Sequence, residues 1–330
     1  MDEFKAMTTN PLNEIADGIH LFIPPPDRIA GWRRSGNVVI LDSDKSLFLI
    51  DSGGPSARKQ IKSIVRSFLA SGSQDIYSIH THGHIDHMAG AYLLQESFEA
   101  SIWAPEEAIP FVMKQSPIYL EREQELLVVS FSELFTAPSW FVRGAMWATL
   151  GRNRPLFDVK PVGSCGNLDE TGFRQVALPG HHFGHTGFYS DEEGILIAGD
   201  LIDPRHKMKP NLTSPSSDFV ELRDALHIAG KLAPSTILPG HGFPIQGDDE
   251  IQQAIEEAEA IMDGALQAVI EILEKAPSTL PEISNRMVRK GIGPGDVFRR
   301  MFIHSILRHL METRTVSRQT EARGKTVFSI

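Results

Sequence analysis

The chain has 330 residues, of which 41% are hydrophobic and 22% charged, an ordinary globular composition with enough apolar material for one large core or two smaller ones. No apolar run reaches the roughly 18 residues that a membrane span requires, and the polar N-terminus lacks the apolar core of a signal peptide. The single cysteine, Cys165, excludes an internal disulfide and a metal site built from several thiolates. We therefore expect a cytoplasmic protein with no membrane partner, in which histidine and carboxylate side chains hold any metal.

Short strands and one helix occupy the first part of the chain. The apolar, β-branched runs G-I-H-L-F-I, N-V-V-I-L-D and S-L-F-L-I-D-S-G-G predict strands from about residue 15 onward. Apolar residues at helical spacing predict a helix from Ala57 to Ala70. The strand D-I-Y-S-I-H then leads directly into T-H-G-H-I-D-H, residues 81–87. These histidines therefore lie on a loop after a strand, where α/β folds often place chemistry.

Residues 105–155 differ from their surroundings because they combine helical spacing with large side chains. They predict a helical insertion that either covers a site as a lid or wall, or belongs to the core or to a dimer interface. The large side chains are Phe111, Met113, Phe131, Phe135, Trp140, Phe141, Met146 and Trp147.

Strands resume near Phe173, Gly194 and Ser235, and each leads to a glycine followed by a histidine or an aspartate: L-P-G-H, A-G-D and P-G-H-G. From Asp249 the chain predicts a long helix, then two more helices, then two strands around A-R-G-K. Helices followed by a terminal hairpin indicate a winged-helix-like module.

Charge is unevenly distributed along the chain. The formal net charge is −10, but residues 277–330 carry +6 and the rest of the chain carries −16. An acidic body repels polyanions, whereas a basic tail can attract them.

Crowded imidazoles and carboxylates indicate divalent metals of the zinc, iron or manganese type. In H-x-H-x-D-H, His82 and His84 can face one point while Asp86 and His87 face another. Two metals need further ligands, and the later strand ends offer them: His181, Asp200 and His241.

In this order, the four motifs and L-I-D-S-G at Leu49–Gly53 resemble the metallo-β-lactamase superfamily over about residues 15–247. The resemblance implies an α/β fold, an αββα sandwich with metals at one edge between the sheets. It gives a domain at 1–247 with the helical insertion at about 105–155, and a C-terminal helical, winged-helix-like domain at 248–330.

The resemblance also implies roles for particular residues. His82, His84 and His181 would hold one metal, while Asp86, His87 and His241 would hold the second and Asp200 would bridge the two. Asp51 would orient a ligand histidine. In P-G-H-H-F-G-H the family pattern selects His181 over His182 as the ligand, and places His185 near the substrate as a catalytic residue together with Asp86.

The expected function is metal-dependent hydrolysis. Two metals sharing one water lower the pKa of that water from about 15.7 toward neutrality, so that it attacks as a bridging hydroxide. Zinc is the expected metal, with iron or manganese as alternatives. A redox branch of the family carries glutamate where this chain has His84, so we expect hydrolysis.

We expect a small-molecule ester, thioester or lactone with a hydrophobic acyl part, and a homodimer. The tyrosine that acyl-homoserine lactonases carry soon after the bridging aspartate is absent here, which disfavours that branch. An alternative is a ribonuclease or phosphodiesterase whose basic C-terminal module follows nucleic acid; its candidate residues are Arg286, Arg289, Lys290, Arg299 and Arg300. A third hypothesis is a metal-binding sensor without turnover, although every expected ligand is present.

Overall fold

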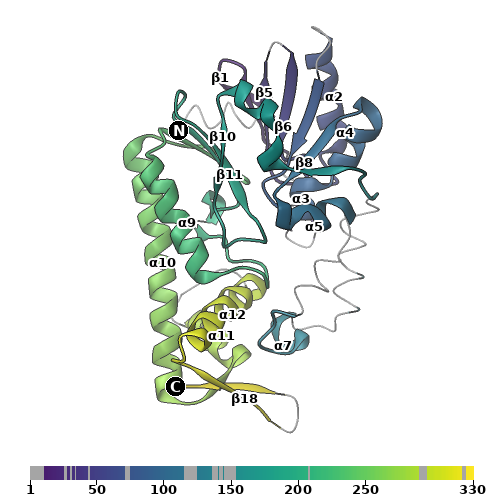
Figure 1. Ribbon diagram of the computed structural model, residues 1–330. Coiled ribbons are helices and arrows are strands. Elements are labelled where there is room, and N and C mark those ends of the chain that lie inside the picture. The colour runs from purple at the N-terminus through teal and green to yellow at the C-terminus, as the bar shows by residue number, and fades with distance from the viewer. Residues whose placement is uncertain are drawn as a thin grey trace.

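The structure, a computed structural model, describes residues 11–25, 28–29, 32–33, 35–43, 45–70, 75–114, 125–135, 140, 144, 154–206, 209–289, 296–321 and 325–330. Two mixed sheets form its centre (Figure 1). The first has the order β1-β2-β5-β6-β7-β8-β9, with parallel pairing from β6 to β9. Its strands are Leu12–Ala16, Ile19–Phe22, Val38–Asp42, Ser46–Ile50, Asp75–Ile79, Ser101–Ala104 and Val159–Pro161.

The second sheet has the order β10-β11-β12-β15-β16, in which only β12 and β15 are parallel. Its strands are Arg174–Ala177, Thr186–Ser190, Ile195–Gly199, Thr236–Pro239 and Ile245–Gln246. The strands expected near Phe173, Gly194 and Ser235 are thus confirmed as β10, β12 and β15.

Side-chain alternation along the strands builds four layers, because successive residues of a strand point to opposite faces. In β6, Leu47 and Leu49 pack with helices α2 (Arg58–Leu69) and α4 (Ala91–Phe98), whereas Phe48 faces the second sheet. In β12, Ile197 faces the first sheet, and Leu196 packs toward α9 (Phe219–Leu232) and α10 (Asp248–Lys275). Figure 1 shows the helices on the outer side of each sheet. The expected αββα sandwich is confirmed.

The C-terminal module consists of α10, β17 (Ser278–Thr279), α11 (Leu280–Arg289), α12 (Asp296–Glu312), β18 (Ser317–Thr320) and β19 (Thr326–Ser329). Its small sheet has the order β17-β19-β18, which gives the expected winged-helix-like topology. Ile306 and Phe328 of the module belong to the same buried cluster as Ile237 of β15. One core therefore extends from the second sheet into the module, and the division at 247 and 248 stays a prediction.

The described part of the insertion contains η1 (Glu106–Ala108), α5 (Ile109–Lys114) and α7 (Phe131–Phe135). Helix α7 contacts α11 and α12 of the C-terminal module. The Val128 N–H donates to Nε2 of His304 at 3.1 Å, and Arg318 Nη1 donates to the Val128 carbonyl at 3.2 Å. The insertion thus reaches from the first sheet to the far end of the molecule. Phe141, Met146 and Trp147 lie outside the described residues.

The remaining elements are short. They are β3 (Arg28–Ile29), β4 (Trp32–Arg33), α3 (Ile85–Met88), η2 (Val162–Ser164), η3 (Gly166–Thr171), β13 (Ile202–Asp203), η4 (Pro204–His206) and β14 (Lys209–Pro210). Among the helices in the described ranges, none combines the length and the apolar character needed to cross a membrane.

Candidate metal centre

All seven predicted ligand side chains converge at one place, although they come from four loops on both sheets. The loop after β7 and helix α3 supply four of them, and the loops after β10, β12 and β15 supply one each. The potential ligand atoms fall into two groups, each with all its atoms within 4.8 Å of one another. The first cluster is His82, His84, His181 and Asp200; the second cluster is Asp86, His87 and His241.

The distances within each cluster suit a metal ion. His181 Nε2 lies 2.9 Å from His84 Nδ1 and 3.4 Å from Asp200 Oδ2. His241 Nε2 lies 3.2 Å from His87 Nε2 and 3.3 Å from Asp86 Oδ2. Ligands placed about 2.0–2.2 Å from a tetrahedral zinc ion are about 3.4 Å from one another. The ligand atoms therefore already have the spacing of a coordination shell.

Asp200 stands between the two clusters. One carboxylate oxygen, Oδ2, faces His181 of the first cluster, while Oδ1 lies 3.3 Å from His87 Nε2 in the second. Asp200 Oδ1 and His82 Nε2 are both buried, and apart from the contact of Oδ1 with His87 Nε2 neither atom has a hydrogen-bond partner among the described residues. Leaving such an atom unsatisfied costs about 1–3 kcal/mol. A cation beside each atom would satisfy it, so the residues present fit a metal pair.

Hydrogen bonds on the far side of the rings orient the histidines. His87 Nδ1 lies 2.8 Å from Asp51 Oδ2, and His181 Nδ1 lies 2.6 Å from the Asn211 carbonyl. Carboxylates and carbonyls only accept, so both Nδ1 atoms donate and both Nε2 atoms face the cluster. Asp51 also accepts from the Thr81 N–H at 2.8 Å, and its backbone is left-handed, with φ 63°. The role expected for Asp51 has a structural basis in these contacts.

His185 lies beneath the ligands. Its Nδ1 donates to the Leu178 carbonyl at 2.6 Å, and its Nε2 accepts from the Asp200 N–H at 3.0 Å. Both ring nitrogens are therefore engaged with backbone groups, and the contact to Asp200 makes His185 a positioning residue for that carboxylate. A direct catalytic role for His185 stays a prediction that these contacts do not favour.

His182 is buried but belongs to neither cluster. Its ring centroid lies 4.4 Å from that of His84 and 5.0 Å from that of Phe111. The structure thus places His181 in the first cluster and His182 beside it, against the aromatic start of the insertion.

Two asparagines support the centre, although no sequence motif marks them. Asn211 accepts from His181 through its carbonyl and donates from Nδ2 to Asp200 Oδ2 at 2.9 Å. Asn37 Nδ2 donates to the carbonyls of Pro239 and Gly242, both at 2.9 Å, and so holds the loop that carries His241. Sequence reasoning missed both, because their partners are distant in the chain.

Burial and neighbouring charges give the two clusters different protonation properties. Burial lowers the pKa of His84 to about 3 and holds the pKa of His82 well below its usual value. These rings are neutral and ready to bind metal. Burial also opposes a charge on His87, but Asp200 and Asp51 outweigh it and raise the pKa of His87 well above its usual value. In the metal-free protein, His87 is therefore the ligand that holds a proton.

The C-terminal module reaches the first cluster through Arg308 of α12. Arg308 Nη1 donates to the carbonyl of Ser217 at 3.3 Å, and Ser217 Oγ donates to the carbonyl of His181 at 2.9 Å. Arg308 Nη2 also lies 3.7 Å from Asp218, which caps α9. The module therefore supports the loop that carries His181 of the first cluster.

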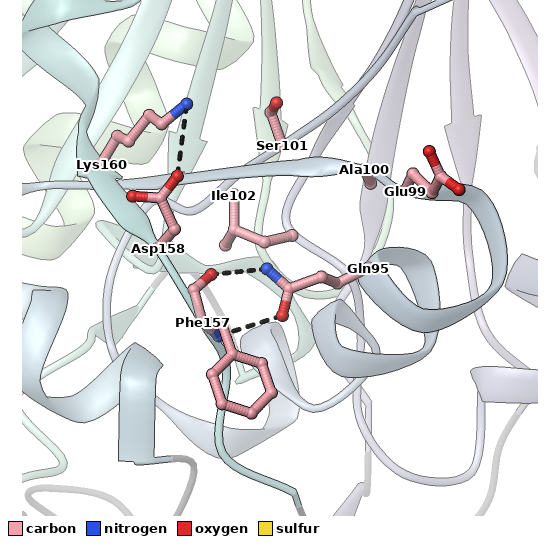
Figure 2. Close-up of a pocket in the computed structure, with 8 residues that line it drawn as sticks. All are labelled: Gln95, Glu99, Ala100, Ser101, Ile102, Phe157, Asp158 and Lys160. Carbon is pink, nitrogen blue, oxygen red and sulfur yellow. Dashed lines mark hydrogen bonds and ion pairs between the residues drawn. The ribbon is translucent and has the colours of Figure 1, made fainter.

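An open pocket of about 390 Å³ lies elsewhere, beside α4, β8 and β9 (Figure 2). The side-chain amide of Gln95 donates to the Phe157 carbonyl at 2.6 Å and accepts from the Phe157 N–H at 3.0 Å. No member of either cluster lines this pocket. The amide pairs with the backbone at the sheet edge, which is a structural role.

Comparison with known proteins agrees with this geometry. Residues 31–241 match the Metallo-beta-lactamase superfamily. The chain is 28% identical over 217 residues to the "Probable metallo-hydrolase YflN" of Bacillus subtilis, covering 61% of this chain and 77% of that protein. It is 26% identical over 210 residues to the "Hydroxyacylglutathione hydrolase GloC" of Haemophilus influenzae, covering 62% of this chain and 84% of that protein.

Among solved structures, the metallo-beta-lactamase family protein TTHA1429 of Thermus thermophilus superposes with a TM-score of 0.70 at 23% identity, covering 96% of this chain and all of that one. A beta-lactamase domain protein of Burkholderia ambifaria superposes with a TM-score of 0.65 at 19% sequence identity, covering 97% of this chain and 94% of that one. The likeness in fold therefore includes the C-terminal helices. The chain belongs to the metallo-β-lactamase superfamily, and its two histidine and aspartate clusters are those of a metallo-hydrolase.

Proposed function

We propose that the protein is a dinuclear metal-dependent hydrolase, with zinc as its metal, that cleaves a small-molecule ester, thioester or lactone with a hydrophobic acyl part. The observation that carries the proposal is the placement of Asp200 between two adjacent ligand clusters. Bound metals supply an activated water and polarise the carbonyl group that it attacks. His82, His84 and His181 would hold one ion, Asp86, His87 and His241 the other, and Asp200 would contact both.

The two carboxylates of the centre are suited to different tasks. The Asp200 side chain is 7% exposed and held by Asn211, whereas the Asp86 side chain is 27% exposed. Burial alone would raise the pKa of Asp86, but the adjacent His87 and His241 hold it below its usual value. Asp86 is therefore an ionised carboxylate that solvent can reach, and it can accept a hydrogen bond from the attacking water and orient it.

The substrate class rests on the surroundings of the first cluster. Phe111 stacks on Phe183 with ring centroids 5.5 Å apart, and both rings lie against His182. A Cβ atom at Gly83, between two ligand histidines, would lie 2.7 Å from Phe111 Cβ. Phe111 is buried and Phe183 is half-buried, so this apolar wall presents the Phe183 ring, with Phe111 behind it, and supports a hydrophobic acyl group beside the first cluster. The likeness to a hydroxyacylglutathione hydrolase supports a thioester, since a hydroxyacylglutathione is one.

The contacts of the C-terminal module favour a supporting role over nucleic-acid binding. Residues 301–307 of α12 are all buried, so this stretch of the helix is enclosed by protein and cannot enter a groove. Arg299 is buried, Arg300 donates to the Glu133 carbonyl, and Arg286 donates to Ser278 Oγ. The side chain of Arg289 and the whole of Lys290 lie outside the described residues. We therefore do not propose cleavage of nucleic acid.

A panel of esters, thioesters and lactones with acyl chains of increasing length tests the function on zinc-replete protein. We expect hydrolysis that strengthens with acyl length and falls by about 100-fold or more in Asp86→Asn, because the variant loses a proposed metal ligand and the carboxylate that orients the water. Arg154→Gln, an exposed change on the remote Glu96 ion pair, should leave the rate unaltered. Metal-replete protein without turnover on any substrate would instead support the sensor. The expected homodimer stays a proposal, which sedimentation would test.

A further inference from the structure

A charged side chain that the proposed mechanism does not use lies beside the second cluster. Arg205 belongs to η4, five residues after Asp200, and its side chain is 21% exposed. Its Nε donates to Asp203 Oδ1 at 2.8 Å, and its Nη2 donates to Asp203 Oδ2 at 2.7 Å. This two-point contact holds the planar guanidinium in one orientation.

The backbone places Arg205 next to a metal ligand. A Cβ atom at Gly242 would lie 3.1 Å from Arg205 Cγ, so the stem of the arginine packs against the residue that follows His241. Burial alone would lower the pKa of Arg205, but Asp203, Asp200 and Asp86 outweigh burial and raise it. The guanidinium is therefore within electrostatic reach of carboxylates from both clusters.

Arg205 has N–H donors that Asp203 does not engage. Asp203 engages one edge of the guanidinium, and no hydrogen bond or ion pair with another described residue engages Nη1. A half-buried cation with an open edge is suited to a planar anion. Two divalent cations and a shared hydroxide would together offset the charge of Asp51, Asp86 and Asp200. The loaded centre would then not repel an anionic group, and the Arg205 guanidinium would attract it.

We propose that Arg205 is a specificity-determining residue that binds a carboxylate on the leaving half of the substrate. This inference rests on the proposed function, because the apolar wall of Phe111 and Phe183 beside the first cluster is assigned to the acyl half. The carboxylate lies on the opposite side, by His241. The substrate class becomes an ester or thioester that joins a hydrophobic acyl group to an alcohol or thiol bearing a carboxylate.

Thiol probes test the inference without turnover, because a thiol can bind the metal while its far end reaches toward Arg205. Each acid is paired with the neutral alcohol of equal length: mercaptoacetate with 2-mercaptoethanol, 3-mercaptopropionate with 3-mercaptopropanol, and 4-mercaptobutyrate with 4-mercaptobutanol. Dissociation constants are measured by calorimetry on zinc-loaded protein, with metal content checked after each titration.

We expect wild type to bind at least one acid about 10- to 100-fold more tightly than its alcohol partner, the range for a hydrogen bond to a charged group. This preference should fall at least tenfold in Arg205→Gln and partly in Arg205→Lys, which keeps the charge but loses the planar fork. Arg154→Gln is the matched arginine control and should keep the full preference.

Two results would overturn the inference. One is the lack of any acid preference in wild type, which needs no variant to fold. The other is a preference that Arg205→Gln retains, since chelation by the metals would then explain it. The proposed function fails separately: protein that prefers the acids but hydrolyses no ester, thioester or lactone keeps the carboxylate site and loses the hydrolase assignment.

Discussion

The two ligand clusters use the same residue types but differ in protonation and access. In the first cluster, burial keeps His82 and His84 neutral, and Asn211 holds both His181 and Asp200. In the second cluster, carboxylates keep a proton on His87, and the Asp86 carboxylate is open to solvent. The first cluster is therefore built to hold a metal firmly. In the second cluster a metal would compete with the proton on His87, and the Asp86 side chain is more exposed than that of Asp200.

The largest effect is expected where both clusters share a close contact. A Cβ atom at Gly240 would overlap with Asp200 Oδ1 and lie 2.8 Å from His87 Cε1. Gly240→Ala should therefore displace ligands of both clusters, lose most of the bound metal and destabilise the fold by about 1–3 kcal/mol. The matched control is Gly264→Ala in α10, where nothing lies within 4 Å of the added Cβ. There, alanine should stabilise by up to about 1 kcal/mol. Equal metal content in the two variants would contradict the packing argument.

Asp51→Asn should lower the metal affinity of the second cluster more than that of the first. Asp51 accepts directly from His87 Nδ1, whereas it is linked to His82 of the first cluster through Thr81 Oγ1, which lies 2.8 Å from His82 Nδ1. An asparagine of the same size loses the charge that orients His87, so zinc affinity at the second cluster should fall about 10- to 100-fold. Competition with a chromophoric chelator would measure both affinities. A similar loss at both clusters would show that Asp51 supports the whole centre.

Acid should remove metal from the second cluster first. The raised pKa of His87 means that its proton competes with the metal, so affinity there declines as pH falls, beginning above the usual histidine value of 6.5. The first cluster should resist further acidification, because the pKa of His84 is about 3. In metal-free protein, acid has the opposite effect on folding stability. Protonated His87 stabilises the fold below pH 6.5, and this contribution is lost as pH rises through the raised pKa of His87. Metal content after dialysis at stepped pH tests the order, and simultaneous loss would refute it.

The smallest effect is expected at Arg308, which contacts no member of the first cluster directly and is linked to His181 through Ser217. Arg308→Ala should weaken zinc binding there about 2- to 10-fold, the range for one ordinary hydrogen bond, and Arg308→Lys should restore part of it. Arg286→Ala, which loses a bond to Ser278 within the module, is the control and should leave metal affinity unchanged. An equal loss in both variants would mean a general effect on the module.

The sequence predicted which side chains form the two clusters, because each lies in a short motif after a strand, where local spacing is enough to place it. The helical spacing around Ile61 and Val65 likewise predicted α2. Helix α9 was not predicted, although the sequence carries a signal for its start. Asp218 caps the helix by accepting a hydrogen bond from the Glu221 N–H, and a glutamate three residues after the cap is a capping-box pattern.

The roles of other residues could not be predicted, because they depend on contacts between distant segments. Asn211 supports the centre only because the loop after β14 packs beneath His181. His185 matches a motif position that suggests a place near the substrate, yet its partners are the backbone groups of Leu178 and Asp200. The sequence order of residues gives no information about which backbone atoms surround a buried ring.

The most direct test of the central claim is the metal content per chain of protein purified without chelator, for wild type and for Asp200→Ala. The account predicts about two equivalents in wild type, as in other dinuclear sites of this kind, and a clear loss in the variant because Asp200 contacts both clusters. One equivalent or none in wild type, unchanged in Asp200→Ala, would contradict the shared carboxylate and with it the dinuclear hydrolase.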